Sequence, residues 1–154
     1  MAQDVPKVGD IMQKNVLAVP LDTTARDCSK AMAKRGVGCA VIMGGGAAAG
    51  IVTERDLVAK VIADELEPKK VLVRDIMSTP LITVSVDSPI TEAAKVMAQY
   101  RVRRLVVVGG QVELLGIITT GDIARSLAEK QDFKDENLNA MARLSEKPES
   151  GPYQ

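Results

Sequence analysis

No histidine occurs among the 154 residues of the chain. Any candidate site therefore lacks the commonest general base, the commonest metal ligand and the usual pH-sensitive side chain. The two cysteines, Cys28 and Cys39, are too few for a zinc site or a disulfide scaffold, and we interpret them as buried free thiols. No nucleophile–base pair or metal cluster is evident, so the sequence predicts a protein that is not an enzyme and binds no metal.

Aromatic residues make up only 2% of the chain, and neither sign of charge is in excess. A chain without net charge and without stacking aromatics is not expected to bind nucleic acid or an anionic membrane. No apolar run approaches the ~20 residues of a membrane helix, and residues 1–7 have no apolar signal core. We expect a soluble, cytoplasmic protein whose core is built from Val, Ile, Leu, Ala and Met.

What the chain does contain is an internal repeat. Val-Gly-Asp-Ile-Met at 8–12 returns as Val-Arg-Asp-Ile-Met at 73–77. After one additional residue in the second copy, Gly-Ile-Val-Thr at 50–53 returns as Gly-Ile-Ile-Thr at 116–119. Many matches at a nearly constant offset indicate two copies of one structural unit.

Each copy predicts the element order β-α-β-β-α. The predicted strands are apolar and bounded by glycine or polar residues: 16–19, 39–43 and 50–52 in the first copy, and 81–84, 105–108 and 115–118 in the second. Three strands with two helices on one face make a unit too thin to close its own core. We therefore predict that the two copies pack sheet to sheet.

The predicted helices follow from apolar stripes with helical spacing. Ala25, Cys28 and Met32 form one stripe, and Ile90, Ala93, Ala94 and Met97 form the other. In the second copy, Asp87-Ser88-Pro89 offers an N-cap candidate followed by proline at the expected first helical position. A closing helix is expected to begin at Thr53 in the first copy and at Thr119 in the second.

The Asp-Ile-Met opening, the apolar strands after the helix and the closing Gly-Ile-Val-Thr-x-x-Asp resemble the CBS domain family from about Val8 to Lys130. The resemblance implies an α/β fold of the α+β type, with two β-α-β-β-α CBS repeats related by a pseudo-twofold axis (a Bateman module). We assign repeat 1 to 8–65, a linker to 66–72, repeat 2 to 73–130 and a polar tail to 131–154. This is the organisation of a stand-alone CBS-domain protein.

Two Thr–Asp pairs are the first candidate site residues: Thr53 with Asp56, and Thr119 with Asp122. Threonine at an N-cap with an acid three residues later is a helix capping box. The same geometry lets a carboxylate accept hydrogen bonds from the two hydroxyls of a ribose. The resemblance assigns the ribose to this Asp and places the Thr in the same pocket.

Basic and apolar residues complete the predicted clefts. The resemblance implies that Arg103 and Arg104 bind phosphate, with Arg55 a weaker candidate for the opposite cleft. It also implies an adenine slot formed by Leu17, Val37, Ile82 and Val102, with Thr79 at its edge. Taken singly, each of these slot residues is more often an ordinary core position, and only their joint placement around one cleft favours the slot. The alternative for the arginines is a solvated, charged surface.

The sequence therefore leads to one main functional hypothesis and one alternative. The main hypothesis is a regulatory or energy-sensing module that binds AMP, ATP or a related adenosyl ligand in the clefts between the two repeats and requires no cofactor. We expect it to form a homodimer through the helices near 25–32 and 90–97, unless their stripes are used internally, and to act on an unidentified regulated protein. The alternative is a structural or protein-interaction dimer without ligand. The Thr–Asp pair in both copies favours the former.

Overall fold

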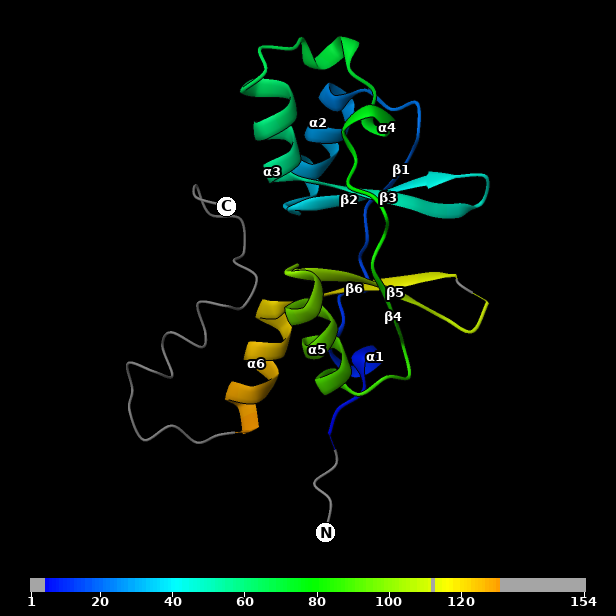
Figure 1. The fold of residues 1–154 in the computed structure, drawn as a ribbon, viewed down its shortest axis with the longest axis vertical. Helices are drawn as coiled ribbons and strands as arrows, with labels where there is room; N and C mark the ends of the chain where they lie inside the picture. Colours follow the sequence, from blue (N-terminus) through cyan, green and yellow to red (C-terminus); the bar gives the residue numbers. More distant parts are fainter. Residues whose placement is uncertain (1–4, 112, 131–154) are drawn as a thin grey trace. The chain divides into compact units, whose positions relative to one another are not determined.

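The computed structural model describes residues 5–111 and 113–130. The described residues form two compact units (Figure 1). Unit 1 joins residues 5–14 to the part of the chain after 82, and unit 2 consists of residues 15–82. The predicted polar tail, 131–154, lies outside the described residues. Each unit contains one three-stranded sheet with helices, so the predicted mixed fold with three strands in each copy is confirmed.

Unit 2 contains a sheet of order β1-β2-β3, in which β1 is parallel to β2 and β2 is antiparallel to β3. In chain order its elements are β1 (Ala18–Pro20), α2 (Ala25–Arg35), β2 (Cys39–Gly44), β3 (Ala47–Thr53), α3 (Glu54–Leu57), the π-helical turn η1 (Val58–Ile62), the 3₁₀ turn η2 (Pro68–Lys70) and α4 (Val73–Ile76). The turn η2 lies within the predicted linker.

Unit 1 has the same arrangement, with sheet order β4-β5-β6, β4 parallel to β5 and β5 antiparallel to β6. Its elements are α1 (Val8–Ile11), β4 (Thr83–Ser85), α5 (Ile90–Tyr100), β5 (Arg104–Val108), β6 (Leu114–Thr119) and α6 (Thr120–Lys130). β1 and β4 each begin two residues later than predicted.

The opening segments of the two repeats are exchanged between the units. The segment with α1 comes from the first repeat but belongs to unit 1, where Val8 donates to the carbonyl of Ser88 at 2.8 Å. The segment with α4 opens the second repeat but belongs to unit 2, where Val73 donates to the carbonyl of Thr23 at 2.8 Å (Figure 1). Each compact unit thus combines the opening segment of one repeat with the sheet and helices of the other.

Helices α2 and α5 bury the predicted stripes, with two differences at α5. Ala94 is exposed rather than buried, because it lies at the margin of the stripe that Ile90, Ala93 and Met97 bury. The prediction that Pro89 is the first helical residue is wrong. Pro89 is extended, with ψ 152°, and is itself the N-cap residue, without a side-chain hydrogen bond. In α2, Thr24 accepts from the backbone N–H of Asp27, as an N-cap residue does.

The core of unit 2 forms around α2. Cys28 is fully buried among aliphatic side chains, and its Sγ lies 3.9 Å from Sδ of Met32. The opening segment contributes Val73 and Ile76 to the same cluster. The cluster consists of Leu17, Val19, Ala25, Cys28, Met32, Ala40, Ile42, Val52, Val61, Val73 and Ile76. Both cysteines are buried free thiols, as predicted.

Candidate functional site

In unit 2, the predicted pair Thr53 and Asp56 forms a capping box at the start of α3. The Asp56 backbone N–H donates to Oγ1 of Thr53 at 3.2 Å, and the Thr53 backbone N–H donates to Oδ2 of Asp56 at 2.9 Å. Both bonds satisfy backbone donors that the first turn of a helix leaves without a partner. The capping interpretation of this pair is therefore realised in the structure.

In unit 1, Thr119 and Asp122 repeat this geometry at the start of α6. The Asp122 backbone N–H donates to Oγ1 of Thr119 at 3.1 Å, and the Thr119 backbone N–H donates to Oδ2 of Asp122 at 2.9 Å. Asp122 is only 1% exposed, whereas Asp56 is 7% exposed. Buried carboxylates are uncommon in proteins, and here two of them lie at equivalent helix starts.

The exchanged opening segments supply a further donor to each carboxylate, which sequence reasoning missed. In unit 1, the side-chain amide of Gln13 donates to both oxygens of Asp122, at 3.2 and 3.3 Å. In unit 2, the hydroxyl of Ser78 donates to both oxygens of Asp56, at 3.1 and 3.3 Å. Gln13 and Ser78 follow Asp-Ile-Met at the same place in the two repeats. A polar residue at this matched position was the available signal.

Backbone pairing fixes these two donors beside the sheet. Gln13 exchanges two backbone hydrogen bonds with Ile117 of β6, at 2.8 and 3.0 Å. Ser78 makes the equivalent exchange with Ile51 of β3, at 2.8 and 3.3 Å. The glycines next to these positions allow the close approach: a Cβ on Gly116 would lie 2.7 Å from the carbonyl oxygen of Gln13, and one on Gly50 would lie 3.0 Å from that of Ser78.

A cation from the same helix also contacts each carboxylate, and sequence reasoning missed these residues too. Nζ of Lys60 lies 3.1 Å from Oδ1 of Asp56 and donates to the carbonyl of Ile76 at 2.9 Å. Nη2 of Arg125 lies 2.6 Å from Oδ1 of Asp122. The spacings of four and three residues along a helix are those at which opposite charges meet, so this signal was present in the sequence.

The predicted phosphate-binding arginines lie beside the cap of α6. Arg104 is the direct cross-strand partner of Thr119, and the carbonyl of Arg103 accepts from the backbone N–H of Thr120 at 2.9 Å. Arg103 is exposed and Arg104 is half-buried. At the equivalent places in unit 2, Cys39 is the partner of Thr53 and Gly38 accepts from Glu54. The basic pair is thus specific to unit 1.

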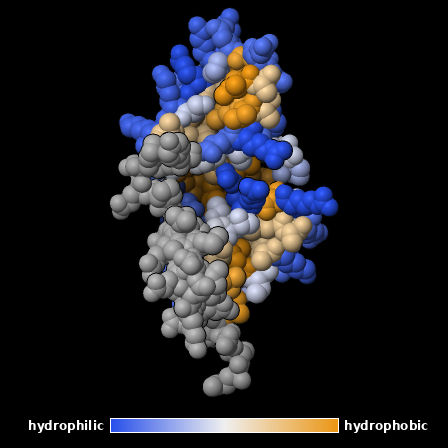
Figure 2. Space-filling model, turned by 90° about the vertical axis from the view of Figure 1, so that its left-hand side faces the viewer, coloured by the Kyte–Doolittle hydropathy of each residue, from blue (hydrophilic) through white to orange (hydrophobic). Residues whose placement is uncertain are grey.

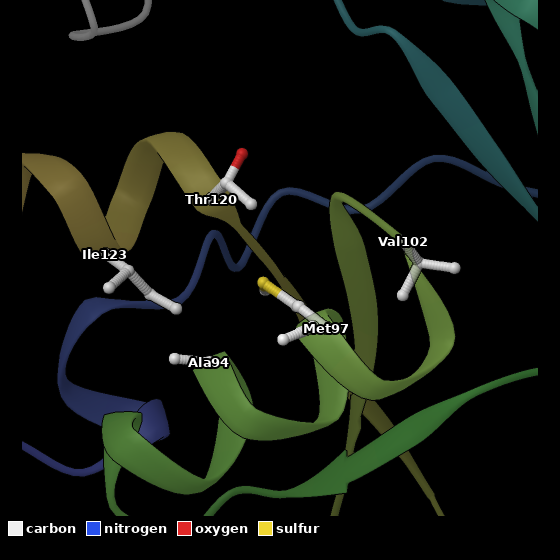
Figure 3. A pocket seen from close by; sticks show the side chains of 6 residues that line it. Ala94, Met97, Val102, Thr120 and Ile123 are labelled. Atoms are coloured by element: carbon white, nitrogen blue, oxygen red, sulfur yellow. The ribbon is translucent and has the colours of Figure 1, made fainter.

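A pocket of about 290 Å³ opens between α5 and the first turn of α6 (Figure 3). Its lining is almost entirely apolar: Ala94, Met97, Ala98, Val102, Thr120 and Ile123. Val102 was predicted in the adenine slot. Thr120 directly follows Thr119, so the apolar pocket and the capped carboxylate share one turn of helix. An apolar cavity next to a few polar groups is typical of small-molecule sites.

The remaining predicted site residues belong to unit 2. Leu17 is part of the core cluster and Val37 packs against it, as ordinary core residues do. Thr79 is exposed and directly follows Ser78, which binds Asp56, and Ile82 is half-buried. Arg55 is exposed on α3. Thr79 therefore lies next to a residue that binds the Asp56 carboxylate. Val102, Arg103 and Arg104 lie in unit 1, near the start of α6 and therefore near Asp122.

The sequence model of the CBS domain matches this chain twice, at residues 8–63 and 73–129. The chain belongs to the CBS domain family. As a tandem pair of CBS repeats, it shares 39% identity over 117 residues with an uncharacterized protein of Methanopyrus kandleri. That match covers 75% of this chain and 60% of the relative, so the chain spans less than two thirds of the relative's length.

Solved structures of CBS pairs share the fold. The CBS domain pair of protein MJ0100, in complex with 5′-methylthioadenosine and S-adenosyl-L-methionine, has a TM-score of 0.74 at 26% identity and covers 83% of this chain and 100% of its own. A hexameric CBS-CP12 protein from bloom-forming cyanobacteria has a TM-score of 0.74 at 30% identity, with coverage of 91% and 80%. Among the described residues, no helix is long and apolar enough to cross a membrane.

Proposed function

We propose that this CBS pair is a non-enzymatic regulatory module that binds an adenosyl ligand, with AMP and ATP as the first candidates. The observation that carries the proposal is the combination at the first turn of α6. A buried carboxylate, Asp122, shares the first turn of α6 with an apolar pocket that Val102 and Thr120 help to line. The carboxylate can accept from two ribose hydroxyls, and the pocket can accommodate an apolar ring.

The chemistry of recognition is an exchange of donors at the carboxylate. Asp122 already accepts from Thr119, Gln13 and Arg125, so ribose hydroxyls must replace one or more of these donors. Arg103 and Arg104 are the proposed phosphate-binding residues, because the planar fork of N–H donors in arginine matches phosphate oxygens. At Asp56 the donors are Thr53, Ser78 and Lys60, and this site has no equivalent of the Arg103–Arg104 pair.

A CBS pair with the same fold, that of MJ0100, is described in complex with two adenosyl compounds, which supports this class of ligand. The alternative is an interaction module without ligand, in which the Thr–Asp pairs serve only as helix caps. The apolar pocket favours the ligand-binding proposal, because a cap alone requires no cavity.

We also propose that the chain self-associates. The predicted contact through the stripes of α2 and α5 is disfavoured, because those stripes are buried within the units. Apolar side chains instead remain exposed at Val58 (55%) and Ile62 (67%) of η1. Figure 2 shows apolar patches among hydrophilic side chains on the face that it presents. The hexameric assembly of the CBS-CP12 protein supports a homo-oligomer.

Self-association can be tested by light scattering at micromolar concentration. A double change, Val58→Lys with Ile62→Lys, should reduce the molar mass towards that of a monomer. The matched control is Val5→Lys, which alters a side chain exposed to 45%. A monomeric parent protein would contradict the proposal, and so would an unchanged oligomer in the double variant.

The ligand proposal is tested by thermal-shift measurements with AMP, ADP, ATP, NAD and S-adenosylmethionine. A ligand that binds only the folded state raises its stability, by about 2.7 kcal/mol at a hundred times its Kd. Calorimetry with Asp122→Ala should then show affinity at least about tenfold weaker, since bonds to a charged group contribute ~1.5–3 kcal/mol each. The control is Asp64→Ala, an exposed acid. Equal affinity in both variants would reduce Asp122 to a helix cap.

A further inference from the structure

Donors from the same chain occupy the acceptor positions of the Asp122 carboxylate. Oδ1 accepts from Gln13 at 3.2 Å and from Arg125 at 2.6 Å, and Oδ2 accepts from Gln13 at 3.3 Å and from Thr119 at 2.9 Å. A carboxylate offers about four acceptor positions, so these donors saturate it. The exposed fraction of 1% agrees with a group that has no acceptor position left for solvent.

These donors differ in how readily they can leave. The Thr119 N–H belongs to the capping box of α6, so its replacement would cost the helix part of its cap. Arg125 is 25% exposed in its side chain and lies on the same helix. Gln13 is the donor that comes from neither α6 nor the cap residue directly before it, and its separation of 109 residues from Asp122 makes it the long-range partner.

We propose that Gln13 competes with the ligand's ribose for Asp122, so that binding at this site releases the opening segment of unit 1. This inference rests on the proposed function. Gln13 ends the segment that carries α1, which is held to unit 1 through Val8 and Ser88 and through the Gln13–Ile117 exchange. The side-chain amide of Gln13 adds a further attachment, through Asp122, to these backbone bonds. A ribose that takes the place of this amide removes the side-chain attachment, so ligand binding loosens the segment that carries α1.

The equivalent position in unit 2 offers less competition. Ser78 presents a single hydroxyl donor, whereas the amide group of Gln13 has two N–H groups. The side chain of Asp56 is 10% exposed, compared with 1% for that of Asp122. Release of an opening segment is therefore expected chiefly at the Asp122 site.

Competition by Gln13 and support by Gln13 predict opposite changes in ligand affinity when the side chain is removed. If Gln13 merely orients Asp122 for the ligand, its removal weakens binding. If Gln13 occupies the position that the ribose needs, its removal strengthens binding, although the protein without ligand becomes less stable. The direction of the change in affinity therefore decides between the two roles.

The experiment uses the full chain with Asp56→Asn as the parent, so that Asp122 is the remaining carboxylate, and adenosine as the probe in titration calorimetry. Gln13→Ala should bind adenosine about tenfold more tightly than the parent, as expected for the loss of a competing bond to a charged group. The control Gln99→Ala, an exposed glutamine on α5, should match the parent. Equal or weaker binding by Gln13→Ala would overturn the inference.

A second measurement keeps the inference separate from the proposed function. If neither the parent nor any variant binds adenosine, the proposed ligand is wrong at this site, and the attachment is tested without ligand by hydrogen exchange. In Gln13→Ala, the Ile117 amide, which donates to the carbonyl of residue 13, should exchange faster than in Gln99→Ala. Unchanged exchange would show that the side chain does not hold the segment, and would overturn the inference independently of any ligand.

Discussion

Gly36 and Arg101 occupy the same place after the first long helix of their repeats, and both are left-handed, with φ of 63° and 55°. Each ends its helix as a C-cap, and each donates its backbone N–H back into the last turn. Glycine adopts this conformation without strain, whereas a residue with a Cβ does so at a cost. The second repeat thus retains the shape of the first with a less suitable residue.

Arg101→Gly should therefore stabilise the protein by about 0.5–1 kcal/mol, the strain relieved less the extra entropy of glycine in the unfolded chain. Urea denaturation measures this as a higher midpoint with an unchanged slope. The reciprocal change Gly36→Arg should lower the midpoint. A lower midpoint for Arg101→Gly would indicate that the arginine side chain makes a contact more valuable than the strain that it causes.

Burial, and then the nearby Cys39 thiol, raise the pKa of Cys28 from its ordinary value of 9.0 to about 11. Below pH 9 the thiol is protonated in both the folded and the unfolded state. Between pH 9 and 11 it ionises only in the unfolded state, so the free energy of unfolding falls as pH rises through this window. The loss expected from this group is roughly 2–3 kcal/mol.

The measurement is the urea unfolding free energy at several pH values from 8 to 11, for the wild type and for Cys28→Ala. The difference in slope between the two proteins isolates the contribution of the thiol, because every other titrating group is common to both. The variant will be less stable at pH 8 because a buried atom is lost. Its stability should nevertheless fall less steeply above pH 9, and parallel curves would contradict the prediction.

Local patterns were sufficient for the main helices and strands and for the Thr–Asp caps, but not for the start of α5. Two of these patterns each span only a few residues. The stripe of Ala25, Cys28 and Met32 is buried in α2, and Thr53 and Asp56 form the capping box of α3. The placement of Pro89 as the first helical residue was wrong because Pro89 remains extended and is itself the N-cap, which the sequence Asp87-Ser88-Pro89 does not determine.

Local sequence patterns could not predict which sheet each opening segment pairs with. The segments with α1 and α4 are four-residue helices with nearly the same sequence, so nothing local distinguishes which sheet each one joins. Their exchange brings Gln13 to Asp122 and Ser78 to Asp56. A contact across 109 residues depends on the fold of the whole chain, and therefore this part of the candidate site required the structure.

The exchange of opening segments predicts how fragments behave. Residues 1–68 contain the first repeat but lack Val73 and Ile76, which the core of unit 2 requires, and lack Ser78, the partner of Asp56. This fragment should be unfolded or aggregated, without a cooperative thermal transition in circular dichroism. Residues 15–82 restore those contacts and should retain more helix at the same concentration. A soluble, cooperatively melting 1–68 monomer would contradict this prediction.

The arginine pair of unit 1 predicts that the two carboxylate sites are not equivalent. Arg104 lies across from Thr119 and Arg103 accepts from Thr120, whereas Cys39 and Gly38 take these places in unit 2. Charge-assisted bonds to phosphate are roughly twice as strong as neutral ones, so AMP or ATP should bind first at the Asp122 site. The hydrogen bonds from Gln13 to Asp122 oppose this preference, so the experiment must isolate the part of the affinity that depends on the phosphate.

Calorimetry should compare the affinities of AMP and adenosine. In the wild type, the 5′-phosphate should raise the affinity, and this increase should disappear in the double variant Arg103→Ala with Arg104→Ala. Any weaker site at Asp56 should be retained in that double variant. Two equivalent sites in the wild type, both unaffected by the double change, would mean that the arginines contribute no more than surface charge.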